Sequence, residues 1–135
     1  MYYNNKNLSG NPVFTRIDKS INFDWGLGSP NPLIRSDRFS VRWQGIVISP
    51  TTEKYTFITQ SDDGVRLWVN NKEIINNWGD HGVTTNKGSI LLQAGQRNTI
   101  RMEYYEDLAD AVAKLSWSTP IIPQQIISSA NLTSQ

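Results

Sequence analysis

The sequence predicts an all-β fold, an antiparallel β-sandwich or barrel in a single domain, and three observations indicate it. Apolar and polar residues alternate over several short runs, the period typical of half-buried strands. Gly, Pro, Asn or Asp residues bound these runs, as expected for strands joined by turns. No segment sustains the spacing of an amphipathic helix.

Individual runs support this fold class in order along the chain. Phe39, Val41 and Trp43 share one face of a strand, and Gly45 then predicts a bulge before a short apolar run. Asn70-Asn71 is a turn of the type that tolerates positive φ, so it predicts a hairpin between two neighbouring strands. The expected strands are residues 39–43, 46–48, 55–59, 65–69, 73–75, 89–92, 99–105 and 113–117.

Four connections are longer or more unusual than simple turns, and functional residues on β scaffolds usually lie in such loops. They are residues 26–37, 61–64, 76–88 and 106–111. After Pro120 the chain is mostly polar, which predicts a last edge strand and then a linker. We therefore expect a domain over residues 1–127 and a C-terminal linker or tail over residues 128–135.

Size and charge exclude several classes of function. The 135 residues suffice for one domain with its own core. Thirteen Lys and Arg against twelve Asp and Glu leave a net charge of +1 without a basic block, so nucleic acid is not an expected partner. No apolar run approaches the roughly 18 residues that span a bilayer. The absence of cysteine excludes disulfides and thiolate chemistry. We expect a monomeric module within a longer chain.

Asp62-Asp63-Gly64 carries the strongest local signal. Two adjacent carboxylates raise each other's pKa, and either full solvation or a shared cation relieves the repulsion. Neighbouring strand residues point to opposite faces, so both carboxylates reach one ion only if the backbone turns sharply, which Gly64 makes plausible. One interpretation is therefore a cation site, and the other is an ordinary solvated turn.

The order of motifs along nearly the whole chain resembles the protective-antigen-type β-barrel domain. This family is shared by bacterial toxin protective antigen, yeast flocculins, epithelial adhesins and inserts of some glycosidases. The resemblance rests on these segments: Tyr2-Tyr3-Asn4-Asn5, Ile21-Asn22-Phe23-Asp24-Trp25, Phe39-Ser40-Val41-Arg42-Trp43-Gln44-Gly45, Ser61-Asp62-Asp63-Gly64-Val65-Arg66-Leu67-Trp68-Val69, Leu92-Gln93-Ala94-Gly95 and Glu103-Tyr104-Tyr105-Glu106.

The resemblance implies a calcium ion held by Asp62 and Asp63, joined by a cis peptide bond, in members that bind carbohydrate. It also implies that the loop 106–111 completes the site, with the Asp107 side chain and backbone carbonyls near Ala109 and Asp110 as ligands. Calcium suits these groups because it takes six to eight oxygen ligands and leaves room for sugar hydroxyls. The expected function is calcium-dependent binding of a polysaccharide or glycan, outside the cell or at its surface.

Further ligand contacts are expected beside the ion. Trp78 lies in a polar loop, where it is either a platform for a sugar ring or a cap over the core. Asp80 and His81 follow it, although a lone loop histidine is usually just solvated. Leu108 lies in the loop 106–111 itself, called the ion loop below. Together with Asp62 and Asp63 these residues form the expected ligand-binding set.

Two other functional classes are possible for a domain of this fold class. Hydrolysis of a glycosidic bond by two carboxylates needs them roughly 5 to 10 Å apart across the bond, which adjacent aspartates do not provide, so we do not expect an enzyme. The remaining alternative is a protein-interaction or spacer domain with the same fold and no sugar site. Flocculins shape their pocket with cysteine-containing insertions, which this chain lacks, so their mannose preference does not carry over.

Overall fold

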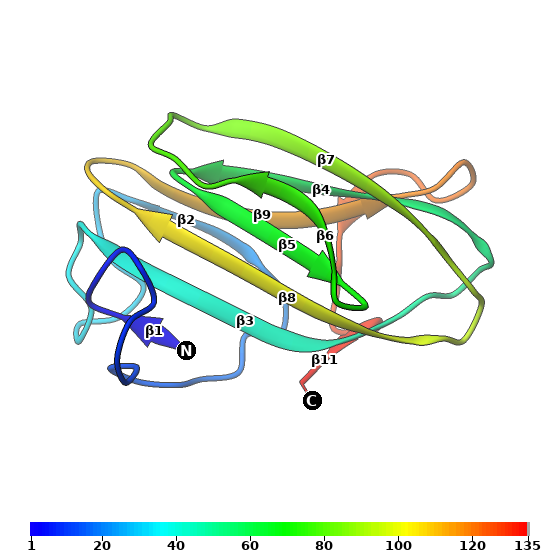
Figure 1. Cartoon of the computed structure of the whole chain (residues 1–135), viewed down its shortest axis with the longest axis horizontal. Helices are drawn as coiled ribbons and strands as arrows, with labels where there is room; N and C mark the ends of the chain where they lie inside the picture. The colour runs from blue at the N-terminus through cyan, green and yellow to red at the C-terminus, as the bar shows by residue number, and fades with distance from the viewer. Residues whose placement is uncertain (135) are drawn as a thin grey trace.

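The computed structural model describes residues 1–134, which fold into two antiparallel β-sheets packed face to face (Figure 1). Within this described part there is no helix, and accordingly none that could cross a membrane. The strands in chain order are β1 (Tyr2–Tyr3), β2 (Asn22–Gly26), β3 (Phe39–Ile48), β4 (Glu53–Asp62), β5 (Val65–Val69), β6 (Lys72–Asn77), β7 (Thr84–Leu92), β8 (Arg97–Glu106), β9 (Ala111–Ser118), β10 (Gln125–Ile126) and β11 (Leu132–Thr133).

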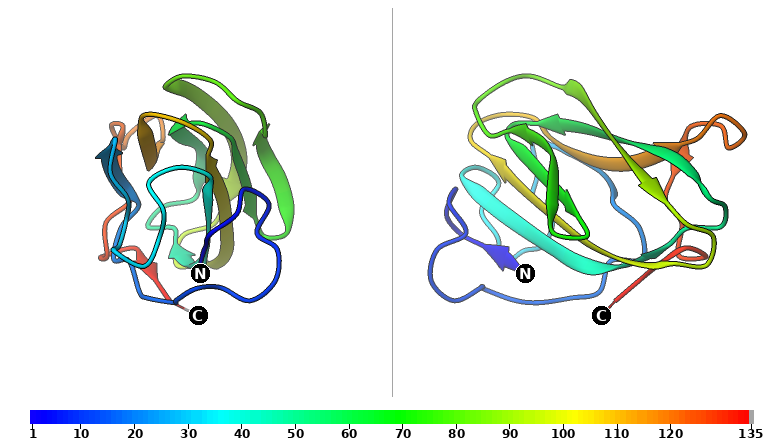
Figure 2. Two further views of the ribbon diagram at one scale, coloured as in Figure 1. Left: turned by 90° about the vertical axis from the view of Figure 1, so that its left-hand side faces the viewer. Right: turned by 45° about the vertical axis from the view of Figure 1, so that its right-hand side comes forward.

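The two sheets are separate layers, so the sandwich alternative is confirmed and the barrel is not closed (Figure 2). One sheet has the order β1-β3-β8-β5-β6, with β11 also paired to β3. The other has the order β10-β9-β4-β7, with β2 paired to β9. Strands distant in sequence, such as β3 and β8, therefore pair along their whole length.

Apolar side chains from the inner faces of both sheets form the core. Phe57, Leu67, Met102 and Leu115 are among its fully buried members, and Trp117 packs with them as expected. A second cluster lies around Phe39 and includes the residues Tyr2, Ile34, Val41, Tyr104, Ala111 and Ala113. Tyr104 belongs to this cluster, which therefore extends to the end of the sandwich where β8 is followed by the loop 107–110.

Three details differ from the sequence-based expectations. Gly45 does not form a bulge, because β3 pairs with β8 without a register shift; instead, the Thr133 carbonyl lies where a Cβ of residue 45 would be. The connection after β6 is residues 78–83 rather than 76–88, because the polar segment from Thr84 already belongs to β7. Leu132 and Thr133, in the expected tail, pair with β3.

The strand ends bring the two predicted loops together. Asp62 ends β4 and pairs with Val112 of β9, while Val65 begins β5 and pairs with Tyr104 of β8. Glu106 ends β8 opposite Phe39 of β3. The segment 61–64 and the loop 107–110 therefore meet at one end of the sandwich.

Candidate metal centre

Three carboxylates converge at this end of the molecule. Oxygen atoms of Asp62, Asp63 and Glu106 lie within 4.8 Å of one another. The side chains are withdrawn from solvent, because Asp62 is 9%, Asp63 6% and Glu106 0% exposed. The Asp62–Asp63 peptide bond is cis, as the resemblance implied.

Backbone groups hold the two aspartates in place. The Asp63 carboxylate accepts one N–H at each oxygen: His81 donates to Oδ1 at 3.1 Å, and Asp107 donates to Oδ2 at 2.7 Å. The Tyr104 hydroxyl donates to the backbone carbonyl of Asp62 at 2.6 Å. Tyr105 exchanges backbone hydrogen bonds with Asp63 and Gly64. The aspartates are thus fixed by β8 on one side and by two loops on the other.

Glu106 is the member of the cluster with unmet hydrogen-bonding capacity. Both of its carboxylate oxygens are buried and have no hydrogen-bond partner among the described residues. Burial, followed by the charges of Asp63 and then Asp37, raises the pKa of Glu106 to about 8. Burial and the neighbouring Asp63 likewise raise the pKa of Asp62 to about 6. Buried oxygens without donors, crowded by like charges, have the chemistry of a cation site.

The residues of the expected ion loop fall into different roles. Asp107 Oδ1 forms ion pairs with Lys6 at 3.2 Å and Arg38 at 3.6 Å. The backbone N–H of Asp107 donates a hydrogen bond to the Asp63 carboxylate. Ala109 has a φ of 72°, and its N–H donates to Asp37. Asp110 is exposed, and its charge contributes to the raised pKa of Asp62.

Trp78 is half-buried, and the Arg66 guanidinium carbon lies 3.8 Å from its ring centroid. The Trp78 ring also packs edge-on against Tyr105 with centroids 4.8 Å apart, and Trp78 belongs to neither core cluster, so its role as a sugar platform stays a prediction. The Asp80 carboxylate accepts a hydrogen bond from the Tyr105 hydroxyl at 2.6 Å.

The last two expected ligand contacts, His81 and Leu108, lie on the loops 78–83 and 107–110. His81 is half-buried, and its Nδ1 lies 2.7 Å from the Gly82 carbonyl. A carbonyl only accepts, so Nδ1 carries the proton. Leu108 is 53% exposed at the surface of the ion loop. The structure thus brings His81 next to Asp63 and leaves Leu108 facing solvent.

Sequence reasoning did not single out Glu106 or Asp37. A signal for Glu106 exists, because Ile100, Met102 and Tyr104 alternate on the inner face of β8, and extending the period by two places Glu106 on that face. No local signal identifies Asp37. It enters the neighbourhood only because the segment before β3 lies against the ion loop.

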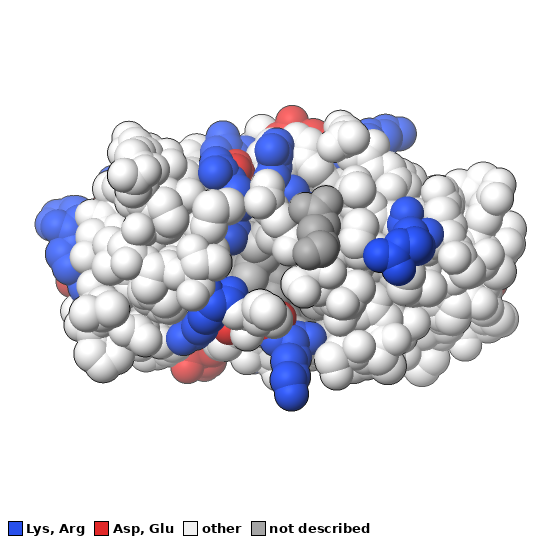
Figure 3. Space-filling model, turned by 90° about the horizontal axis from the view of Figure 1, so that it is seen from below, with Lys and Arg blue, Asp and Glu red and all other residues white. Residues whose placement is uncertain are grey.

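A cavity of about 590 Å³ lies elsewhere, between the segment 15–19, β3 and the C-terminal residues 129–134. Figure 3 shows a hollow on this side of the molecule, with Lys and Arg side chains around it. Ile21, Ile100 and Met102 contribute apolar lining. None of the three clustered carboxylates lines this cavity.

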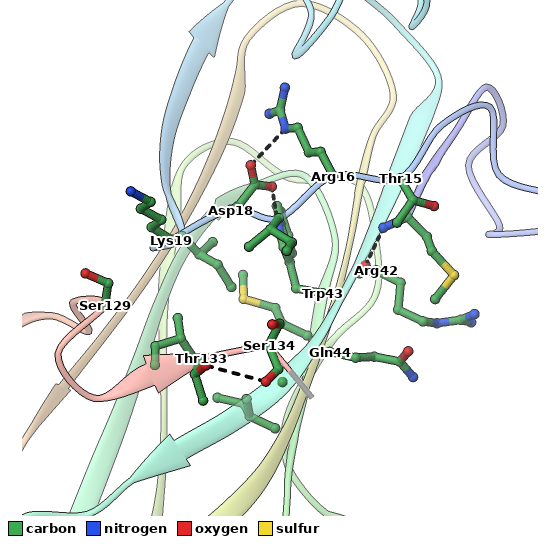
Figure 4. A pocket seen from close by; sticks show the side chains of 17 residues that line it. Thr15, Arg16, Asp18, Lys19, Arg42, Trp43, Gln44, Ser129, Thr133 and Ser134 are labelled. Carbon is green, nitrogen blue, oxygen red and sulfur yellow. Dashed lines mark hydrogen bonds and ion pairs between the residues drawn. The ribbon is translucent and has the colours of Figure 1, made fainter.

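The one carboxylate among residues 1–134 that lines this cavity, that of Asp18, already has its partners. In Figure 4 the Asp18 carboxylate points toward Arg16 and Trp43, which donate at 2.8 and 2.9 Å. The Tyr2 hydroxyl donates to the same carboxylate. Asp18 is therefore satisfied, whereas the Glu106 oxygens are not. For this reason we place the candidate site at the carboxylate cluster rather than at the cavity.

Comparisons with known proteins agree with this fold. The anti-sigma-I factor RsgI3 of Acetivibrio thermocellus is 45% identical over 131 residues, 97% of this chain and 20% of that protein. A solved anti-sigma factor domain-containing protein superposes with a TM-score of 0.96 at 44% identity, over 99% of this chain and 46% of that one. A PA14 sugar-binding domain from an RTX adhesin superposes with a TM-score of 0.71 at 18% identity, over 86% and 77% of the two chains.

The chain thus spans a fifth of the first relative and just under half of the second. A family model described as the PA14 domain matches residues 1–130. The match covers both the cis-linked aspartates and the loop that meets them. From the sandwich, the site and this match, the chain belongs to the PA14 domain family.

Proposed function

We propose that this domain is a calcium-dependent glycan-binding module of a larger secreted or cell-surface protein. The observation that carries the proposal is the buried cluster of Asp62, Asp63 and Glu106, in which neither Glu106 oxygen has a donor among residues 1–134. Three carboxylates within 4.8 Å repel one another unless protons or a cation compensate them. Calcium accepts such oxygen ligands and keeps positions for water or sugar hydroxyls.

The proposed ligand set differs from the sequence-based one at one position. Asp107 Oδ1 is engaged by Lys6 and Arg38, so we propose Glu106 as the third carboxylate in its place. Asp62 and Asp63 are retained, and the backbone carbonyls near Ala109 and Asp110 stay predicted ligands. When bound, calcium would supply charge compensation and a coordination position for sugar hydroxyls.

The relatives support a sensing context for such a module. One structural neighbour is a sugar-binding domain of an adhesin, and RsgI3 is an anti-sigma-I factor. We propose that in a parent of the latter kind this domain recognises an extracellular polysaccharide. The alternative, a spacer domain without a sugar site, shares the fold but predicts no response to calcium.

Thermal unfolding with calcium and with chelator tests the proposal. A ligand that binds only the folded state stabilises it by about 2.7 kcal/mol at 100 times its dissociation constant, which raises the melting temperature of a domain of this size by about 10 °C. The single variant Asp62→Asn, which leaves the hydrogen bonds of Asp63 in place, and the double variant Asp62→Asn, Asp63→Asn are both expected to lose this shift. Glu73→Gln, an exposed carboxylate on β6, is the matched control and should keep it.

Binding to an array of plant, fungal and bacterial polysaccharides, with calcium and with chelator, then tests the glycan. Binding that requires calcium and fails in the Asp62→Asn, Asp63→Asn variant supports the proposal. A calcium-stabilised domain that binds no glycan would leave only the metal site, and a domain that ignores calcium would favour the spacer alternative.

A further inference from the structure

The segment immediately before β3 makes two contacts with the ion loop. Asp37 Oδ1 accepts the N–H of Ala109 at 3.2 Å, and the Arg38 N–H donates to the Asp107 carbonyl at 3.0 Å. The two partners in each contact are about 70 positions apart in sequence. The conformation of the loop 107–110 is therefore set partly by residues outside it.

Ala109 is the point at which this support matters most. Its φ of 72° lies in the left-handed region, which non-glycine residues rarely occupy unless the surroundings hold them there. The Asp37 carboxylate holds the N–H of this same residue. Turning Ala109 out of this conformation would redirect the carbonyls of the loop, which are the predicted backbone ligands.

The charge of Asp37 also faces the cluster. After burial and the charge of Asp63, the charge of Asp37 contributes most to the raised pKa of Glu106. Arg38 and Lys6 direct their charges to Asp107, and no ion pair to Asp37 is formed by residues 1–134. Asp37 thus adds negative charge to the neighbourhood without a cation of its own.

We propose that Asp37 is a positioning residue of the calcium site: it binds no ion itself, but it fixes Ala109 and with it the backbone ligands. This inference rests on the proposed function. Groups behind metal ligands typically change metal affinity roughly 10- to 100-fold when they are removed. Loss of the hydrogen bond in Asp37→Ala is expected to weaken calcium binding by that factor.

Titration calorimetry with calcium chloride on three variants tests this. Asp37→Ala should weaken binding about 10- to 100-fold. Asp37→Asn keeps an oxygen acceptor for the Ala109 N–H and should lose clearly less. Asp24→Ala is the matched control, because Asp24 also accepts the N–H of a positive-φ residue, Gly26, but at the irregular end of β2 rather than within the loop 107–110. It should leave calcium affinity unchanged.

Two measurements in chelator separate positioning from a general structural role. Amide hydrogen exchange at Ala109 should accelerate in Asp37→Ala and stay slow in Asp37→Asn. The melting temperature of Asp37→Ala should stay close to that of the wild type, since a negative charge near other carboxylates is removed. A marked fall would assign Asp37 a structural role instead.

The possible failures are distinguishable. If wild-type protein does not bind calcium, the proposed function fails and this inference with it. If wild type binds but Asp37→Ala binds equally well, only the inference is overturned. Equal weakening in Asp37→Asn and Asp37→Ala would also overturn it, because charge rather than the hydrogen bond would then be responsible.

Discussion

Glu106 shows how a single side chain can be unfavourable for one state of a protein and useful for another. It is fully buried, its oxygens accept no hydrogen bond from the described residues, and its pKa is raised to about 8. The ion-free fold therefore holds a proton there that the unfolded chain, with its value of 4.5, releases at lower pH. Stability from this proton is present below about pH 4.5 and is lost as pH rises through about 8.

Glu106→Gln is consequently expected to have opposite effects with and without calcium. In chelator, the wild type should lose melting temperature between about pH 5 and about pH 9 more steeply than the variant, which should be the more stable at the upper end. With calcium the order should reverse, because the amide is a weaker ligand. Melting temperatures of the wild type and Glu106→Gln across this pH range, measured once with chelator and once with calcium, test the prediction. The same pH dependence in both proteins would contradict it.

Gly64 makes a second residue-level prediction. A Cβ on residue 64 would overlap the Tyr105 ring, which the Asp80 carboxylate and the Trp78 ring hold in place. Overpacking of this kind typically costs about 1–3 kcal/mol. Urea unfolding of Gly64→Ala in chelator should show that loss. Gly79→Ala, where an added Cβ meets nothing within 4 Å, should show almost none.

At the scale of elements, the β5–β6 hairpin depends on the conformation of its turn. Asn70 and Asn71 have φ values of 51° and 64°, the signs that two-residue hairpin turns require. The Asn70 side chain also bonds Asn98 and the backbone of Thr99, whereas that of Asn71 is exposed. Asn71 is thus the position where conformation can be tested with little else changed.

Asn71→Val should lower the free energy of unfolding by about 1–2 kcal/mol, because a β-branched residue is strained at positive φ. Asn71→Gly should match or exceed the wild type, since glycine adopts this conformation without strain. Chemical denaturation of both variants checks the prediction. Equal losses in the two would show that the Asn71 side chain, rather than its φ, stabilises the turn.

Elements could be predicted where packing leaves a local pattern. Val65, Leu67 and Val69 alternate because β5 buries one face, so its bounds were predicted as the structure has them. The first half of β7 was not, because Thr84–Lys87 lie on an edge strand with polar side chains on both faces. Gly45 was interpreted as a bulge because the approach of Thr133 depends on a pairing that no local pattern reveals.

For the molecule as a whole, the sandwich and its membership in the PA14 family could be predicted, while the carboxylate cluster of the candidate site could be predicted only in part. Asp62 and Asp63 were found because they are adjacent. Glu106 joins them because β8 pairs with β5 directly after the two aspartates, and Asp37 approaches through the path of the chain before β3. Such residues become visible only when the sheet brings distant segments together.

The two hydrogen bonds of Asp63 join two loops, residues 78–83 and 107–110, each of which crosses from one sheet to the other. One carboxylate oxygen accepts the N–H of His81 and the other accepts the N–H of Asp107. Movement of either loop would therefore shift the side chain to which the other loop is bound. An amide at position 63 would face one of the two N–H groups with a donor. A substitution at position 63 would change both loop hydrogen bonds as well as the proposed calcium site, whereas Asp62→Asn would leave these two hydrogen bonds in place.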